Sequence, residues 1–462
     1  MVTIYLDKQV FSHLFKEREE KYSLLREKIL SHKDEFIFFY SNAHLFDLQD
    51  DETDIKYSEM DFMQSIVVGN RLIYENSRQE VMKLAPCDAF ETIGKIDDFS
   101  WLENFDVSQI TEEQRNIINN IVDIGVKDLN GDLEFDWLTK RTPISADKLL
   151  VDMQSFISLM KLWSYNFYEN KKSYKILREN TIAKYNPTSI TAESESVLNE
   201  QLILSSLGLS FLDVVKATLV QIGLTSTDFA MVYYTSYMLL DLFGINKETR
   251  KKVKFRNMQI DACHSFFGSY CDCVVSNDEG LVRKSKILYK LFNIDAKVYS
   301  IDEFIDKFDE AISNNKKSVC DSFDEIINDY AIRQVIRTAT MPEHTLTYLN
   351  ASNKYFGYFS GMIEIRSKNE ADIILYKGND LNQPLLAKEI EIIVNRLVRA
   401  FNDIGATLPL FDEAVEMPLI RTDSWYRVLM LGDADVYLTK LKDVPMLCLW
   451  IKLNQPISQT QN

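Results

Sequence analysis

The sequence of 462 residues predicts an α/β protein with a parallel sheet, a large mainly helical insertion and a C-terminal α+β domain. Short apolar runs alternate with helical patterns at residues 2–48 and again at 228–299, which is typical of parallel strands joined by helices. Residues 56–224 carry long helical patterns and few strand signals. Residues 345–453 carry the alternating runs of a mostly antiparallel sheet.

The first segment supplies two predicted strands. Residues 2–6 are apolar or β-branched and end at Asp7, and residues 36–40 form a second apolar run. Residues 9–32 have the apolar spacing of a helix. Ser41 follows the second run and is placed to cap a helix that carries Asp47.

The α/β pattern resumes near residue 225. A helix at 228–243 and a helix that begins with Asp261 precede a buried strand at 271–275. A turn then exposes Asp278, and a helix at 280–292 leads to a last strand at 296–299. We therefore expect residues 1–55 and 225–305 to form one discontinuous domain, with residues 56–224 as a helical insertion.

The rest of the chain is expected to form a helical linker at 306–344 and an accessory α+β domain at 345–462. Two polar helices, at about 301–313 and 321–338, precede a break at Pro342. The accessory domain is predicted to combine one helix with several strands. The helix covers residues 385–403, and the strands cover 355–365, 371–376, 425–431, 435–441 and 446–453.

Composition excludes several classes of protein. The formal net charge of −17 argues against a protein that coats duplex DNA nonspecifically. Six cysteines without a C-x-x-C pair argue against a structural zinc site, and the absence of a signal peptide favours a reducing, cytoplasmic setting. The longest uncharged apolar run, residues 229–240, is too short to cross a bilayer, so no membrane partner is expected.

Four acids stand where a metal-binding site is expected in such a sheet. They are Asp7, Asp47, Asp261 and Asp278. Asp7 and Asp278 follow apolar strands, and we do not expect helix capping to explain acids at those places. Crowded carboxylates are costly unless a cation neutralises them, and Mg²⁺ or Mn²⁺ prefers carboxylate oxygens. Asp47 alone is also explained by solvation, and Asp261 alone by capping.

The order of these motifs resembles the PIN domain, a metal-dependent nuclease fold. The resemblance rests on Ile-Tyr-Leu-Asp7, on Ser41 with Asp47, on Asp261 before a buried strand and on Ser276-Asn-Asp278 after it. It covers about 130 residues in two pieces and does not extend to residues 56–224 or 345–462. The resemblance implies that all four acids are metal ligands or hold metal-bound water, and that no side-chain nucleophile is needed.

Further residues are assigned to substrate binding or to support of the site. Ser276 is expected to bind a ligand or phosphate, and Ser41 and Asn277 to support the acids. Basic residues near the acids are expected to attract a polyanion, although they also suit a solvated helix end. They are Lys252, Lys254, Arg256, Arg283 and Lys284. His44 and His264 are expected to be packed, hydrogen-bonding side chains, and Cys263, Cys271 and Cys273 to fill the core.

The expected function is a metal-dependent endonuclease, with RNA as the favoured substrate because most members of that family cut RNA. Single-stranded or structured nucleic acid is the wider substrate class. The family's habits also suggest a microbial toxin or defence effector, and a regulatory protein or self-association through the insertion or the C-terminal domain. Two alternatives stay open: a non-catalytic PIN-like scaffold or interaction module, and a structure-specific DNA nuclease.

Overall fold

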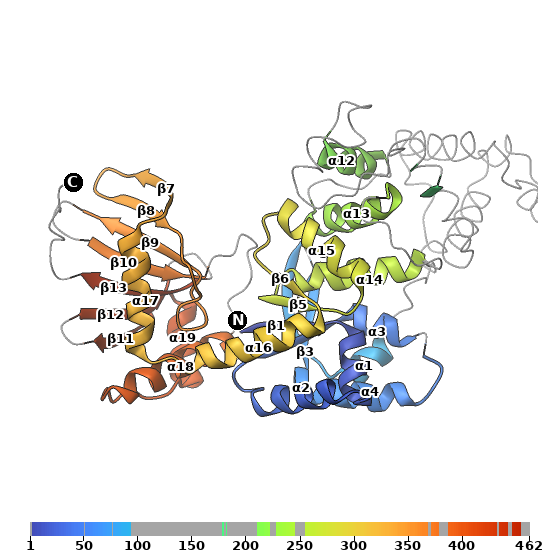
Figure 1. The fold of residues 1–462 in the computed structure, drawn as a ribbon, viewed down its shortest axis with the longest axis horizontal. Helices are drawn as coiled ribbons and strands as arrows, with labels where there is room; N and C mark the ends of the chain where they lie inside the picture. The colour runs from blue at the N-terminus through green and yellow to red at the C-terminus, as the bar shows by residue number, and fades with distance from the viewer. Residues whose placement is uncertain are drawn as a thin grey trace, which may run out of the picture.

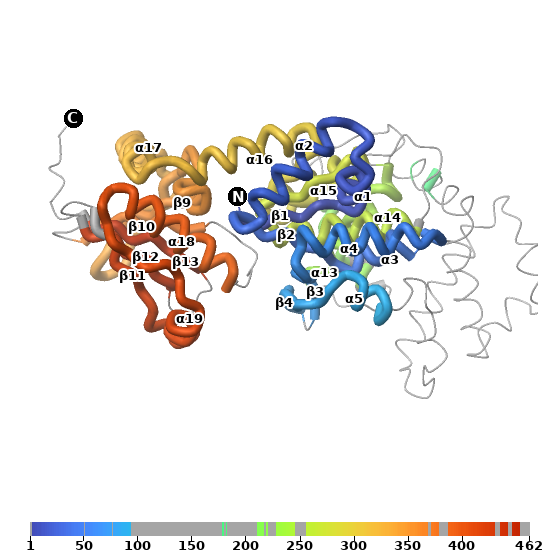
Figure 2. The backbone as a smooth tube through the Cα atoms, turned by 90° about the horizontal axis from the view of Figure 1, so that it is seen from below, coloured from blue at the N-terminus to red at the C-terminus, as the bar shows by residue number. Residues whose placement is uncertain are grey.

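The structure is a computed structural model. It describes residues 2–49, 51–75, 77–93, 178–179, 182, 210–221, 228–244, 255–367, 371–377, 387–431, 434–441 and 446–453. Within these ranges the chain forms two sheets that lie at opposite ends of the molecule, and α16 (Ile301–Asn315) runs from one toward the other in both views (Figures 1 and 2). The predicted helices at residues 112–126 and 148–168 lie outside the described residues.

The N-terminal sheet has six strands in the order β4-β3-β2-β1-β5-β6. All neighbouring strands are parallel except β3 and β4, which form an antiparallel hairpin at one edge. The mixed α/β class expected from the alternation of strands and helices is confirmed. The strands are β1 (Thr3–Leu6), β2 (Ile37–Ser41), β3 (Asn70–Glu75), β4 (Arg78–Lys83), β5 (Cys273–Val275) and β6 (Lys297–Tyr299).

Helices cover both faces of this sheet, because its central strands are apolar on both sides. Ile4 and Leu6 of β1 join a core cluster with α1, α2, α4 and α16, whereas Tyr5 joins the cluster of α13, α14 and α15. The helices of this region are α1 (Lys8–Lys16), α2 (Glu20–Ser31), α3 (Asn42–Gln49), α4 (Ile55–Val67), α5 (Pro86–Thr92), α12 (Phe211–Gln221), α13 (Phe229–Leu242), α14 (Phe255–Gly268) and α15 (Glu279–Leu291).

Two expected boundaries were wrong. The α/β region continues beyond residue 55, because β3 pairs with β2 and β4 completes the edge of the same sheet. The segment 306–344 is not entirely helical, because residues 335–340 form an edge strand of the second sheet. The strands at residues 70–75, 78–83 and 335–340 are polar or exposed. Their sequences lack the apolar alternation by which a half-buried strand is predicted. The single helical pattern at 9–32 is two helices, since Glu17 adopts a left-handed conformation that ends α1.

The C-terminal sheet has seven antiparallel strands in the order β11-β12-β13-β10-β9-β8-β7. Its core face packs against helices α17 (Val319–Ile332), α18 (Ala387–Asp403) and α19 (Glu413–Arg421). The strands are β7 (Val335–Thr340), β8 (Thr345–Leu349), β9 (Gly361–Arg366), β10 (Ala371–Tyr376), β11 (Tyr426–Leu431), β12 (Ala434–Lys440) and β13 (Leu447–Leu453).

Candidate metal centre

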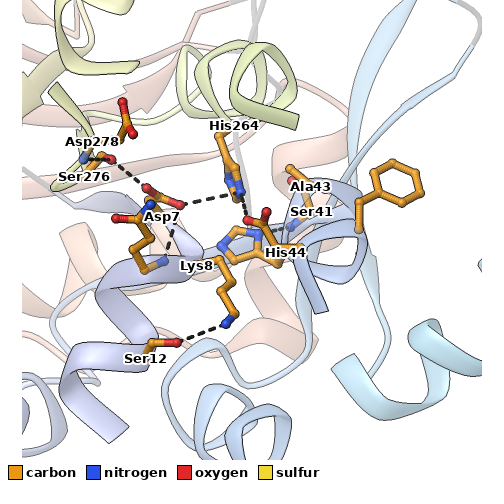
Figure 3. Close-up of polar contacts among 12 residues, drawn as sticks. Asp7, Lys8, Ser12, Ser41, Ala43, His44, His264, Ser276 and Asp278 are labelled. Carbon is orange, nitrogen blue, oxygen red and sulfur yellow. Dashed lines mark hydrogen bonds and ion pairs between the residues drawn. The ribbon is translucent and has the colours of Figure 1, made fainter. Parts of the chain in front are cut away.

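Polar side chains collect where β1 and β5 end, side by side, at the carboxyl edge of the parallel sheet (Figure 3). Asp7 follows β1, and its N–H donates to the carbonyl of Val275 at the end of β5, at 2.9 Å. Ser276 follows next and donates its hydroxyl to Oδ2 of Asp7, at 2.6 Å. Ligand sites in open α/β folds form at this edge, because the strands end there together.

A group of two carboxylates and one imidazole stands at this edge. Asp7 follows β1, Asp47 lies on α3 and His264 lies on α14, and each offers a ligand atom within 4.8 Å of the other two. Nε2 of His264 is 3.0 Å from Oδ2 of Asp47 and 3.6 Å from Oδ1 of Asp7. Asp7 and His264 are buried, whereas the side chain of Asp47 is 31% exposed and leaves one side open to solvent.

A buried network of hydrogen bonds holds His264 in place. The Tyr5 hydroxyl is 2.9 Å from Nδ1 of His264 and 2.7 Å from Oγ of Ser41. Ser41 also accepts from the N–H of Ala43, at 3.3 Å, so it caps α3 as expected. Partners on the far nitrogen orient a ligand imidazole and make it more basic, so this network suits a metal ligand.

His44 belongs to the same network but has a different role. Its Nδ1 accepts from the N–H of Ser41, at 3.1 Å, so Nε2 carries the proton and donates to the carbonyl of Leu6, at 2.7 Å. Burial lowers the pKa of His44 well below its ordinary value, and this side chain is neutral. With both nitrogens engaged, His44 is a packed core histidine, as expected from the sequence.

Burial and neighbouring charges shift the pKa values of the site in different directions. Burial raises the pKa of Asp7, and the charge of Asp47 raises it further, although His264 opposes both effects. Burial also raises the pKa of Asp261 well above its ordinary value, and the charges of Asp278, Asp47 and Asp7 add to this shift, while Lys284 opposes it. For His264, burial lowers the pKa, but Asp7 and Asp47 raise it more. The two carboxylates therefore favour a positive charge between them, and the group of Asp7, Asp47 and His264 is one that could hold a metal ion.

The predicted acids Asp261 and Asp278 lie near this group without joining it. Asp278 caps α15, since its Oδ1 accepts from the N–H of Leu281 at 2.9 Å, and in Figure 3 its carboxylate points away from Asp7. Asp7 likewise caps α1 through the N–H of Gln9, at 3.4 Å. The expectation that capping does not account for these two acids was therefore wrong. Asp261 lies inside α14 rather than at its start, so it is not a cap.

The residues assigned to the substrate have other partners in the structure. Ser276 was expected to bind a ligand or phosphate, and it bonds the predicted ligand Asp7; it is fully buried and accepts from the N–H of Asp278, at 3.0 Å, so it does not face a phosphate. Lys284 is also fully buried, with Nζ 3.4 Å from Oδ1 of Asp241, and cannot line an exposed rim. The assignment of Lys284 to an exposed basic rim was therefore wrong, because the first turns of α15 face the core as well as solvent.

The remaining predicted residues vary in their relation to the site. Arg256 lies beside it, since its Nη2 donates to the carbonyl of Phe46, next to Asp47, at 3.5 Å. Arg283 is exposed on α15 and 3.4 Å from Glu279. Asn277 is exposed in the turn between β5 and α15. Lys252 and Lys254 lie outside the described residues.

Sequence reasoning assigned His264 to packing and overlooked Tyr5 altogether. His264 is indeed buried, but the structure also places it against two of the predicted acids. The spacing Asp261-x-x-His264 was a usable signal, because residues three apart share one face of a helix. A hydroxyl inside the apolar strand Thr3–Leu6 was a second signal, since a buried Tyr hydroxyl usually finds a partner.

Comparisons with known proteins add no match: a scan of family models, a search of curated proteins and a search of solved structures each found nothing similar. Among the described helices, none is long and apolar enough to cross a membrane. The functional argument for this chain therefore depends on its fold and on the geometry of the site.

Proposed function

We propose that this protein is a metal-dependent endonuclease that hydrolyses phosphodiester bonds, with RNA as its substrate. The observation that carries the proposal is the Asp7, Asp47 and His264 group at the carboxyl edge of a parallel sheet. The pKa values of the buried carboxylates Asp7 and Asp261 are raised, so their ionised forms reduce the stability of the folded protein. Groups with shifted pKa values concentrate at functional sites. A microbial toxin or defence role is compatible with this activity and stays a prediction.

The donor set suits Mg²⁺ or Mn²⁺. Asp7 and Asp47 supply hard carboxylate oxygens and His264 supplies an imidazole nitrogen, which Mn²⁺ accepts more readily than Mg²⁺ does. When bound, the ion supplies Lewis-acid activation of water and of a phosphoryl oxygen. Asp261 and Asp278 lie beside the group, and Ser276 fixes the carboxylate of Asp7.

The PIN-like reading is supported by the order of the elements. Strand β1 ends in Asp7, α3 after β2 carries Asp47, and α14 before β5 carries Asp261, while Asp278 follows β5. The parallel order β2-β1-β5-β6 brings the first and last of these segments together although they are far apart in the sequence. This order of segments in one sheet supports the proposal of a two-piece nuclease domain.

The scaffold alternative has less support than the enzyme. A scaffold has no need to place a buried carboxylate near a second one, as Asp7 and Asp47 are placed around the buried imidazole of His264. The DNA-nuclease alternative shares the same site chemistry. Substrate choice separates it from the proposed ribonuclease.

The decisive experiment compares RNA and DNA as substrates. Purified protein is incubated with mixed single-stranded and structured RNA, and separately with the matching DNA, in Mn²⁺ or in chelator. We expect Mn²⁺-dependent cleavage of RNA that chelator abolishes. Cleavage of DNA alone would establish the DNA-nuclease alternative. An absence of cleavage on every substrate, together with no rise in melting temperature when Mn²⁺ is added, would favour the scaffold.

The Tyr5 hydroxyl offers a test of the metal centre that does not depend on knowing the substrate. Replacing Tyr5 with phenylalanine removes the hydrogen-bond partner of Nδ1 of His264, so Mn²⁺ binding should weaken by about tenfold while the fold persists. Mn²⁺ titration followed by electron paramagnetic resonance measures the change. Tyr355→Phe is the control, because its buried hydroxyl bonds Asp329 in the other half of the protein. Equal Mn²⁺ affinity in wild type and Tyr5→Phe would remove His264 from the proposed ligands.

A further inference from the structure

Phe46 is a partly exposed aromatic side chain directly before the proposed metal ligand Asp47. Both residues lie on α3, and neither is among the side chains that this helix buries. Two hydrophobic core clusters collect the buried apolar side chains of the described residues and those packed against them, and Phe46 belongs to neither. The fold therefore leaves an apolar ring outside its core, next to the open side of the metal group.

The outward face of α3 also carries Asn42. Asn42 and Phe46 are both partly exposed and lie four residues apart on the helix, so their side chains are neighbours on one face. The inward face packs against the sheet and its covering helices through Ala43, His44, Leu45 and Leu48. Anything that Asn42 holds in place therefore lies close to the ring of Phe46.

Two arginines from other elements are anchored on α3 at these positions. Nε and Nη2 of Arg71, on β3, both donate to Oδ1 of Asn42, at 3.2 and 2.6 Å. Nη2 of Arg256, on α14, donates to the carbonyl of Phe46, at 3.5 Å. Both acceptors are neutral oxygens, so these hydrogen bonds orient the guanidinium groups without cancelling their charge. An exposed ring and two cations are thus gathered beside Asp47.

This combination suits a single strand of nucleic acid. Proteins bind single strands by stacking bases on aromatic side chains and by placing cations along the phosphates. An apolar ligand would gain nothing from the two arginines, and a free phosphate would gain nothing from the ring. A duplex is a poor ligand, because the faces of its bases are covered by neighbouring bases, whereas unstacked bases in a single strand can reach an aromatic ring.

The position of Phe46 relative to the metal group defines which nucleotide it meets. Asp47 lies 3.0 Å from Nε2 of His264, and its side chain is 31% exposed, so the metal group is approached from the side of α3. Phe46 is the next residue on the same helix. A nucleotide that reaches the metal group with its phosphate therefore has a base within reach of the ring.

We propose that Phe46 stacks on a base beside the scissile phosphate, that Arg71 and Arg256 contact the neighbouring phosphates, and that the protein therefore selects single-stranded RNA over duplex. The proposal rests on the proposed nuclease function, which supplies the class of ligand. Phe46 positions the substrate and offers no metal ligand. Its loss should therefore weaken RNA binding and leave Mn²⁺ binding unchanged.

Fluorescence anisotropy with a labelled single-stranded RNA, in chelator to prevent metal-dependent cleavage, measures affinity apart from turnover. Phe46→Ala should raise the Kd by about tenfold, the effect of losing one stacked base. Phe46→Trp should restore the wild-type Kd, because its larger ring also stacks. Tyr426→Ala is the control, since Tyr426 is 65% exposed on β11 in the other sheet. Equal Mn²⁺ affinity of wild type and Phe46→Ala, measured by electron paramagnetic resonance, verifies that the site is intact.

Two further measurements separate stacking from charge. Wild type should bind the duplex of the same sequence at least about tenfold more weakly than the single strand, and Phe46→Ala should lose this preference. Arg71→Gln keeps a donor for Asn42 but removes a cation, so it should reduce the slope of log affinity against log salt by about 0.7, the effect of one phosphate contact on a single strand. Phe46→Ala should keep the wild-type slope.

The outcomes distinguish this proposal from the proposed catalysis. Equal affinity of wild type and Phe46→Ala for single-stranded RNA would overturn the stacking role, even in a protein that cleaves RNA. So would a wild type that binds no single-stranded RNA or binds duplex as tightly, or a Phe46→Trp variant as weak as Phe46→Ala. RNA binding that depends on Phe46, in a protein that cleaves nothing in Mn²⁺, would support the stacking role and contradict the nuclease function.

Discussion

Replacing Asp7 with asparagine is expected to reduce Mn²⁺-dependent cleavage of RNA by on the order of a hundredfold or more. Both carboxylate oxygens of Asp7 face the site: Oδ1 lies 3.6 Å from Nε2 of His264, and Oδ2 accepts from Ser276, at 2.6 Å. The substitution keeps the shape of the side chain but removes one negative charge, and with it the attraction for a divalent cation.

Stability should respond in the opposite direction. Burial and the charge of Asp47 raise the pKa of Asp7, which means that the folded protein disfavours its ionised form. An acid whose pKa is raised on folding costs stability above that pKa, so at neutral pH in chelator the neutral asparagine should melt no earlier than wild type. Mn²⁺ should raise the melting temperature of wild type but not that of Asp7→Asn.

Asp54→Asn is the matched control for this experiment. Asp54 is exposed before α4 and makes no capping hydrogen bond, so the same chemical change there should leave cleavage and metal-induced stabilisation intact. Wild-type cleavage by Asp7→Asn in Mn²⁺ would exclude Asp7 from the reaction. Loss of cleavage in both variants would point to contamination or general damage rather than to the site.

The strands that hold the site could be predicted because they are apolar and short. Residues 2–6, 36–40 and 271–275 read as buried strands, and the structure places β1, β2 and β5 there, within one or two residues at each end. Strands β3, β4 and β7 could not be found in this way. They carry Arg, Glu and Gln or lie exposed at an edge, so hydrogen bonding to a neighbouring strand, which the local sequence does not encode, defines them.

The acids could be located by their position after strands, but their roles could not. The sequence places Asp7 and Asp278 equally at strand ends, whereas the structure turns one toward His264 and the other toward the first turn of α15. That difference depends on the hydroxyl of Ser276. It donates a hydrogen bond to Oδ2 of Asp7 and accepts one from the backbone N–H of Asp278. Contacts between β1, α3 and α14 bring together the proposed ligands, and such contacts appear only after folding.

Asp272 links the two halves of the protein, although the sequence suggested only that it lies within a buried strand. Its carboxylate accepts from the N–H groups of Val2 and Thr3, at 2.5 and 3.1 Å, in the N-terminal sheet. Lys354 and Lys377, from the C-terminal half, lie 3.4 and 3.3 Å away. One side chain that is 6% exposed therefore joins β1 to the second domain, four residues before Ser276.

Replacing Asp272 with alanine is expected to destabilise the protein by about 3 kcal/mol at neutral pH, near the lower end of what breaking a buried ion pair costs. The lower end applies because Lys377 keeps Glu389, 2.8 Å away, as a second partner. Urea denaturation of wild type and variant measures the difference. Asp302→Ala is the matched control, since Asp302 pairs with Lys21 at 2.8 Å on the surface, where an ion pair contributes little.

The loss should depend on pH in a direction that the charges determine. Burial alone would raise the pKa of Asp272, but Lys354, Lys377 and the N–H of Val2 hold it well below its ordinary value. A carboxyl group whose pKa is depressed on folding contributes its full stability above the unfolded value, near 4, and loses it as pH falls through the folded value. The difference between wild type and Asp272→Ala should therefore be constant from about pH 5 to 8 and shrink below about pH 4. A difference that grows on acidification, or an alanine variant as stable as wild type at pH 7, would show that the ion pairs of Asp272 do not hold the two halves together.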